Sequence, residues 1–154
     1  MTPSALPAGF RLAEGDWLQL EAGARVVRQA VFVVEQGIAP SLEWDLIDAR
    51  SIHVLISDID AGPCATGRLF DDTEPRVARI GRLAVLAHLR GLGLGDAVLA
   101  RLVDLAVAQG SAQAVLHAQT QAAGFYLRRG FVASGDEFIE DGIAHVRMIK
   151  QLHA

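Results

Sequence analysis

Three glycines at alternating positions, Gly91, Gly93 and Gly95, separate an apolar segment from a long amphipathic one. Because glycine has no Cβ, the backbone N–H groups of such a loop can converge on one point. A helix that begins behind the loop adds its unsatisfied N–H groups and the positive end of its dipole. Arg90 adds a positive charge at the entrance. The pattern predicts an anion site suited to a pyrophosphate.

Two familiar phosphate-binding loops do not match this segment. A Walker loop ends in Gly-Lys-Ser/Thr, whereas Asp96 follows Gly95 here. A dinucleotide-binding fold places its glycines after the first strand, whereas three predicted strands precede this loop. A tight turn without a ligand is the plain alternative.

No linker or repeat divides the chain, so the sequence predicts one domain over residues 1–154. Helical spacing of apolar residues predicts helices over Asp16–Phe32, with Asp16 as N-cap, and over Leu94–Gln109, ending before Gly110. The other predicted elements are four strands, a short helix and a hairpin that turns at Asp141-Gly142: Ser51–Ser57, Ala65–Phe70, Arg76–Val85, Ala114–Ala118, Ala122–Arg129 and Val132–Lys150. This order predicts a mixed α/β (α+β) sheet flanked by helices.

Composition excludes several classes of protein. The chain is 51% hydrophobic and 21% charged, which is typical of a globular domain, and its net charge of -4 does not favour a nucleic-acid partner. The N-terminal segment Met1–Gly9 does not resemble a signal peptide, and no apolar run is long enough to span a membrane. Cys64 is the only cysteine, which fits a cytoplasmic location. The five histidines, including His153, show no metal-ligand spacing, so no metal is expected.

A second pattern lies downstream of the glycine loop, where Ala122 is followed by Phe125-Tyr126 and then by Gly130-Phe131. With Arg90-x-x-Gly93-x-Gly95 before it, the chain resembles the GNAT superfamily of N-acetyltransferases. Within that superfamily it is most similar to the ElaA-like branch. Four segments carry the second resemblance: Arg28–Gln36, Ile80–Val85, His117–Tyr126 and Glu140–His145.

The resemblance implies a V-shaped, largely antiparallel sheet of about seven strands with about four helices. The co-substrate would be acetyl-CoA, lying where strands Arg79–Val85 and Ala114–Ala118 splay apart. In relatives, backbone groups of the first strand pair with the pantetheine arm and the loop amides hold the pyrophosphate. The implied coenzyme A site is Leu83, Ala84, Val85, Arg90, Gly91, Leu92, Gly93, Leu94, Gly95, Asp96 and Tyr126. Family members often pair as dimers, so a homodimer is one expectation.

Amine acetylation needs a base for the amine and an acid for the leaving thiolate. Tyr126, the only tyrosine, stands where the family places its thiolate-protonating residue, and packing alone is the alternative. His117 is a candidate base because its ordinary pKa lies near working pH, although a structural histidine is the alternative. Strand Arg76–Val85 contains no Asp or Glu, where relatives often keep their base, so the family pattern identifies none.

An acidic segment that includes an aromatic residue is the predicted acceptor site: Glu35, Trp44, Asp45 and Asp48. Carboxylates beside an aromatic ring suit a cationic amine, and a solvated loop is the alternative. Arg82 alternates onto the face of Ile80 and Ala84, so it is expected to be partly buried and paired with one of these acids. Arg128 and Arg129 are two further candidates for a coenzyme phosphate, between which the sequence does not decide.

The sequence therefore predicts an N-acetyltransferase that moves an acetyl group from acetyl-CoA to a primary amine of a small molecule or peptide, by direct attack on the thioester. An acyl-CoA-binding sensor without turnover is the alternative, favoured by the missing base. An unrelated nucleotide-binding α/β domain is a third reading.

Overall fold

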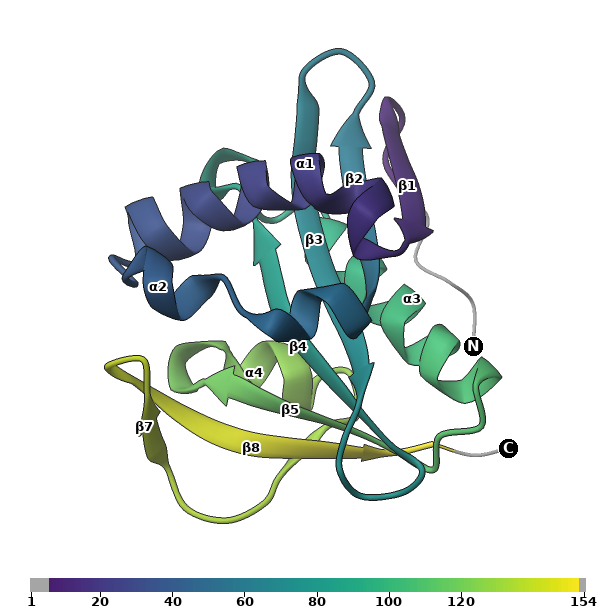
Figure 1. Cartoon of the computed structure of the whole chain (residues 1–154), viewed down its shortest axis with the longest axis vertical. Coiled ribbons are helices and arrows are strands. Elements are labelled where there is room, and N and C mark those ends of the chain that lie inside the picture. The colour runs from purple at the N-terminus through teal and green to yellow at the C-terminus, as the bar shows by residue number, and fades with distance from the viewer. Residues whose placement is uncertain (1–5, 153–154) are drawn as a thin grey trace.

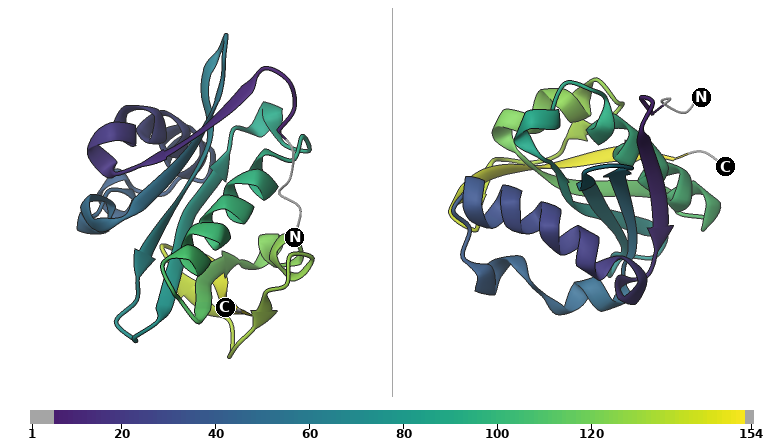
Figure 2. Two further views of the ribbon diagram at one scale, coloured as in Figure 1. Left: turned by 90° about the vertical axis from the view of Figure 1, so that its right-hand side faces the viewer. Right: turned by 90° about the horizontal axis from the view of Figure 1, so that it is seen from above.

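One mixed sheet runs through the molecule, with helices on both of its faces (Figures 1 and 2). This computed structural model describes residues 6–152. Residues 1–5 of the segment Met1–Gly9, which was compared with signal peptides above, and His153 lie outside the described part. The eight strands have the order β1-β2-β3-β4-β5-β8-β6, with β7 paired to β8. The mixed α/β sheet and its flanking helices confirm the predicted fold class.

The strands are β1 (Phe10–Gly15), β2 (Ile52–Asp58), β3 (Gly62–Asp71), β4 (Val77–Val85), β5 (Gln113–Gln119), β6 (Val132–Ala133), β7 (Phe138–Glu140) and β8 (Ile143–Gln151). The helices are α1 (Trp17–Arg28), the π-helix η1 (Gln29–Glu35), α2 (Pro40–Glu43), the 3-10 turns η2 (Leu46–Arg50), η3 (Ala87–Leu89) and η4 (Thr120–Ala122), α3 (Leu94–Ala108) and α4 (Ala123–Leu127).

Two local predictions at the N-terminal end need correction. β1 was not expected, because its alternation is interrupted by polar residues and its strand geometry depends on antiparallel pairing with β2 along one edge of the sheet. The predicted helix Asp16–Phe32 is an α-helix only to Arg28 and continues as the π-helix η1. Its predicted start is confirmed, since Asp16 and Gln19 form a reciprocal capping box.

The sheet divides between β4 and β5, the neighbouring pair that runs parallel. Their register extends from Val77 opposite Gln113 to Ile80 opposite Leu116 and then stops, although both strands continue. In Figure 1 the strands β1 to β4 and the strands β5 and β8 consequently lie at a wide angle to each other. This divergence is the V shape that the family resemblance implied.

A β-bulge in β4 lies on the divergent part of the strand. Thr66 of β3 pairs with Ala84 and Arg68 pairs with Gly81, so β4 has one residue more than β3 between these two pairs. Arg82, inside the bulge, has a φ of 52°, a left-handed conformation that is uncommon for a residue other than glycine. The bulge increases local twist and turns β4 away from β5.

The two faces of the sheet have separate apolar cores. The amphipathic helix α3 packs on β2, β3 and β4 and, with α4, covers one face, where its buried side chains include Leu94, Val98 and Leu102. α1 and η1 cover the other face with a smaller group that includes Val27 and Phe32. The smaller core leaves room beside it for polar residues.

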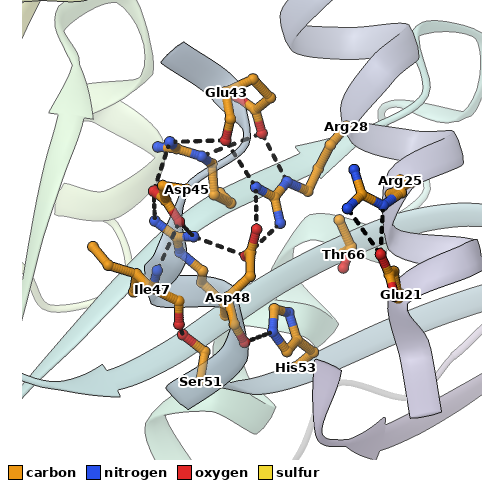
Figure 3. A network of polar contacts seen from close by, with 12 residues as sticks. Glu21, Arg25, Arg28, Glu43, Asp45, Ile47, Asp48, Ser51, His53 and Thr66 are labelled. Carbon is orange, nitrogen blue, oxygen red and sulfur yellow. Dashed lines mark hydrogen bonds and ion pairs between the residues drawn. The ribbon is translucent and has the colours of Figure 1, made fainter. Parts of the chain in front are cut away.

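Six charged side chains fill that room and form what we call the Arg28 cluster: Arg28, Arg68, Arg82, Glu43, Asp45 and Asp48 (Figure 3). Arg28 lies 2.7 Å from both Glu43 and Asp48. Asp48 also accepts from Arg68 at 2.8 Å. Three positive and three negative side chains give the cluster no net charge.

The prediction that Arg82 is partly buried and paired with an acid of this segment is confirmed. Its guanidinium lies 3.2 Å from Glu43 and 3.2 Å from Asp45, with the side chain 20% exposed. Because α2, η2 and their flanking turns have few apolar contacts of their own, these ion pairs fix the segment between η1 and β2 onto the sheet. Such a cluster stabilises little relative to apolar packing, but removing one member leaves a buried charge without compensation.

Asp48→Asn should therefore lower the free energy of unfolding by about 3–5 kcal/mol, because Arg28 and Arg68 both lose a carboxylate in a buried site. Urea unfolding followed by circular dichroism measures the change. Glu21→Gln is the matched control: it breaks the exposed Glu21–Arg25 pair of α1 and should cost at most about 0.5 kcal/mol. Equal small losses in both variants would contradict the role given to the cluster.

His53 makes stability depend on pH, because its ring is buried and bonds through Nε2 to the Asp48 carbonyl at 3.0 Å. Burial lowers the pKa of His53 below its ordinary value of 6.5. The unfolded chain then takes up a proton that the folded chain does not, so stability is complete above pH 6.5 and falls as pH drops below it. The slope reaches about 1.4 kcal/mol per pH unit. His53→Gln should flatten urea-derived stability between pH 7 and 5.5, and identical slopes in both proteins would refute this.

Candidate functional site

A cleft of about 720 Å³ opens where β4 and β5 diverge. Its walls come from η1, the end of β4, the loop before α3, the end of β5, α4 and β7. Segments from both halves of the chain therefore meet at one opening in the sheet. The residues that line it include the glycine loop together with His117 and Glu140.

The glycine loop has the backbone conformation that its sequence requires. Gly91 and Gly93 have φ values of 86° and 84°, and Gly93 is the N-cap of α3. Because the first backbone bond of α3 runs from Ala97 to Gly93, the amides of Leu94 and Gly95 have no carbonyl partner within the helix. The cleft is lined by Gly91, Gly93, Leu94, Gly95 and Asp96, whereas Leu92 does not line it.

Arg90 also lines the cleft, and it already has a partner. Its guanidinium binds both carboxylate oxygens of Glu35, at 2.7 and 2.8 Å, and its Nε donates to the Val85 carbonyl. The hydrogen bonds from Arg90 lower the pKa of Glu35 below its ordinary value. Glu35, predicted to bind the acceptor, therefore lies at the glycine-loop end of the cleft.

Of the two arginines between which the sequence did not decide, Arg129 lines the cleft and Arg128 does not. Arg129 Nε forms a short hydrogen bond with Asp96, and its guanidinium lies 3.8 Å from the centre of the Phe125 ring. The Asp96 carboxylate thus connects the first turn of α3 to the end of α4. Both helices border the same opening.

The edge of β4 is accessible where β5 has left it. Leu83, Ala84 and Val85 line the cleft, and β4 pairs there with β3 on its other side. This is the strand edge expected to meet an extended ligand. The bulge at Arg82 determines which backbone groups that edge presents.

Tyr126 lines the same cleft from α4. Its ring meets Phe125 and Phe131 edge to face, at centroid distances of 5.1 and 6.0 Å. Burial raises the pKa of Tyr126 to about 12, so the phenol is protonated at neutral pH. A protonated phenol in a cleft can donate a proton or a hydrogen bond.

His117 and Glu140 both line the cleft and contact each other there. His117 Nδ1 lies 3.0 Å from a Glu140 oxygen, and Phe138 contacts the imidazole ring edge to face. Because a carboxylate only accepts, Nδ1 carries the proton and Nε2 of the neutral ring has the free lone pair. The hydrogen bond with His117 lowers the pKa of Glu140. The geometry is that of a histidine oriented by a carboxylate, which can accept a proton at Nε2.

Two glutamines connect the opposite walls of the cleft. The side-chain amides of Gln36, just after η1, and Gln119, at the end of β5, exchange hydrogen bonds of 3.3 and 2.8 Å. Together with the Glu35–Arg90 pair, this contact holds η1 across the opening. Neither contact was predicted, because the partners are far apart in the sequence.

Three of the four residues predicted to bind the acceptor do not line the cleft: Trp44, Asp45 and Asp48. Asp45 and Asp48 belong to the Arg28 cluster, and the centre of the Trp44 ring lies 4.7 Å from the Arg25 guanidinium and 4.8 Å from that of Arg28. The prediction paired this acidic segment with Arg82 alone. Arg68, which neutralises it, comes from a distant strand and was not part of the local pattern.

Sequence reasoning also gave little weight to two residues that line the cleft, Glu140 and Arg79. Glu140 lies next to the predicted turn at Asp141-Gly142, but β7 pairs with β8 and β8 pairs with β5, which brings Glu140 to His117. Arg79 lies on β4, the strand on which relatives often keep a carboxylate base. Within residues 6–152 no group of His, Cys, Asp and Glu side chains could hold a metal ion, and no helix there is long and apolar enough to cross a membrane.

Known proteins share both this sequence pattern and this fold. The family described as Acetyltransferase (GNAT) domain matches residues 29–152. An uncharacterized N-acetyltransferase of Bacillus subtilis, YjcF, is 34% identical over 125 residues, which cover 80% of this chain and 87% of that protein.

Solved structures agree with the family match. An acyl-CoA N-acyltransferase from Pseudomonas aeruginosa has a TM-score of 0.80 at 28% identity, and Escherichia coli ElaA has a TM-score of 0.79 at 26% identity. Each comparison covers 92% of this chain and 99% of the other. The family match covers most of the chain, and the solved structures share its fold. The protein therefore belongs to the GNAT acetyltransferase family and is an acyltransferase.

Proposed function

We propose that this enzyme transfers an acetyl group from acetyl-CoA to a primary amine, by direct attack of the amine nitrogen on the thioester. The observation that supports this best is the continuity of the cleft, in which the glycine loop, the β4 edge, Tyr126 and His117 all line one cavity. The donor would enter at the loop and the acceptor at the His117 end.

The donor end fits a pyrophosphate followed by an extended arm. The glycine loop and the first turn of α3 supply backbone donors and the positive end of the helix dipole. The β4 edge at Leu83 to Val85 supplies backbone groups for the arm. Use of an acyl-CoA donor also agrees with the similarity to the Pseudomonas aeruginosa acyl-CoA N-acyltransferase.

The proposed acceptor end of the cleft contains a base that can remove a proton from the amine. An amine with a pKa near 10.4 is neutral in only about one molecule in two thousand at pH 7, so a base gains several kcal/mol of reactivity. We assign the base to His117 Nε2, with Glu140 stabilising the imidazolium that forms. This assignment supplies a base from β5, since β4 contains no Asp or Glu.

The chemical step then balances within the cleft. The nitrogen–carbon bond forms as the amine attacks the carbonyl carbon, and the amine proton passes to His117. Backbone N–H groups of the β4 edge stabilise the developing oxyanion. The carbon–sulfur bond then breaks, and the Tyr126 phenol gives its proton to the thiolate. The proton that His117 gained equals the one that Tyr126 lost, and exchange of both with solvent restores the neutral imidazole and the phenol.

Tyr126→Phe tests this step, because it removes the proton donor and keeps the ring between Phe125 and Phe131. We expect the wild type to release free thiol from acetyl-CoA with at least one member of a panel of primary amines. The variant should show kcat lowered about 100-fold and a coenzyme A affinity within twofold of wild type. Normal kcat would remove the acid role, and coenzyme A binding without thiol release for any amine would favour the sensor.

Gly93→Glu should abolish coenzyme A binding, because a carboxylate would enter the proposed phosphate site at the start of α3. Gly110→Glu is the matched control. It places the same side chain at a glycine of similar φ, 89°, just beyond the other end of α3 and also with open space around its Cβ position. Both variants should lose comparable stability from backbone strain, while only Gly93→Glu loses binding by isothermal titration. Retained micromolar affinity in Gly93→Glu would contradict the proposed phosphate site.

A further inference from the structure

Six residues that line the cleft also contact one another, and we call them the acceptor compartment: Arg68, Phe70, Arg79, His117, Glu140 and His145. Five arginines line the cleft, and four of them have carboxylate partners: Arg68, Arg82, Arg90 and Arg129. Within residues 6–152, Arg79 alone among the five lies in no ion pair. Its charge is therefore unmatched where the acceptor would bind.

Two nitrogens of the Arg79 guanidinium lack suitable partners. Its Nε is buried without a hydrogen-bond partner among the described residues, as are the Nε atoms of Arg68 and Arg82, but the terminal nitrogens of those two arginines bind carboxylates. One terminal nitrogen lies 3.4 Å from His117 Nδ1, but that Nδ1 donates its proton to Glu140. Two donors cannot bond to each other, so this approach does not satisfy the guanidinium.

The position of Arg79 is fixed by its surroundings. Its guanidinium lies 5.6 Å from the centre of the Phe70 ring, against which Arg68 also packs at 5.4 Å. Burial lowers the pKa of Arg79, opposed by the more distant charges of Asp72 and Glu140. An arginine stays protonated in proteins, so the site has a half-buried cation that an incoming anion would compensate.

The neighbouring group has the opposite character. The Glu140 carboxylate and the His117 lone pair suit a protonated or neutral amine, and they lie beside Arg79. A ligand that spans both poles has a nitrogen and an anion close together. The planar guanidinium fork matches a carboxylate, which it can bind through two parallel hydrogen bonds.

We propose that the acceptor is an amino acid, or a similar amine with a carboxylate near its nitrogen, and that Arg79 binds this carboxylate while His117 and Glu140 receive the amine. The inference rests on the proposed acetyl transfer. It replaces the cationic acceptor expected from the acidic segment, whose carboxylates are occupied within the Arg28 cluster.

The test uses matched ligands that need no turnover. Each proteinogenic amino acid is supplied as its N-acetyl derivative and as the N-acetyl amide, which lacks only the charged carboxylate. Binding to the full chain is measured by isothermal titration with and without saturating coenzyme A. At least one acid should bind at least about tenfold more tightly than its amide, a ratio expected for one charge-assisted contact.

Arg79→Gln should remove that preference, and Arg79→Lys should keep part of it, because lysine retains the charge but not the fork. Arg50→Gln is the matched control. Arg50 packs on the same Phe70 ring, at 5.1 Å, but is exposed and does not line the cleft. It should bind the acids as wild type does. Should Arg79→Gln fail to fold, the inference is still tested by the ratio of acid to amide affinity in the wild type and by the same ratio in Arg79→Lys.

Equal binding of acids and amides, binding of no acid, or unchanged preference in Arg79→Gln would each overturn the inference. Coenzyme A affinity and thiol release from free amino acids and simple alkylamines are measured on the same preparations. Acetylation of alkylamines only would leave the transferase standing and refute the carboxylate site. Failure to bind coenzyme A, or to release thiol with any amine, would refute the proposed function instead.

Discussion

β4 and β5 share parallel hydrogen bonds only from Val77 and Gln113 to Ile80 and Leu116, and then diverge. A sheet normally satisfies the backbone groups of an interior strand on both sides. Here β4 leaves one edge exposed inside the fold from Gly81 to Val85, beside a bulge at Arg82. The cleft, its exposed strand edge and the meeting of α3 with α4 all depend on this incomplete pairing.

Charge pairing divides the polar residues around the split into two kinds. On the α1 side, the Arg28 cluster neutralises itself and fixes the loop between η1 and β2. Inside the cleft, the Arg90–Glu35 and Arg129–Asp96 pairs lie near the glycine loop, at the proposed donor end. Arg79 is the charge left over. Enzyme sites commonly contain a charged group that is compensated only when the ligand binds. The other arginines that line the cleft are compensated by carboxylates of the protein itself.

The glycine loop shows how far local sequence carries a prediction. The conformation of Gly91 and Gly93 and the start of α3 follow from residues adjacent in the chain, so the loop–helix unit was predictable. The capping box at Asp16 and the turn at Asp141-Gly142 were predictable for the same reason. The edge strand β1 was not, because its pairing with β2 decides its conformation.

By itself the sequence determined the fold class, the family pattern and the conformation of the glycine loop, since each is encoded in short-range spacing. Tertiary structure decided which charged side chains form ion pairs within the protein and which are available to a ligand. Asp45 and Asp48 face Arg68 from another strand, and Glu140 reaches His117 only through the order of β5, β8 and β7. Charges interact through space, at distances that depend on how strands far apart in the chain are brought together. Local spacing in the sequence does not determine these distances.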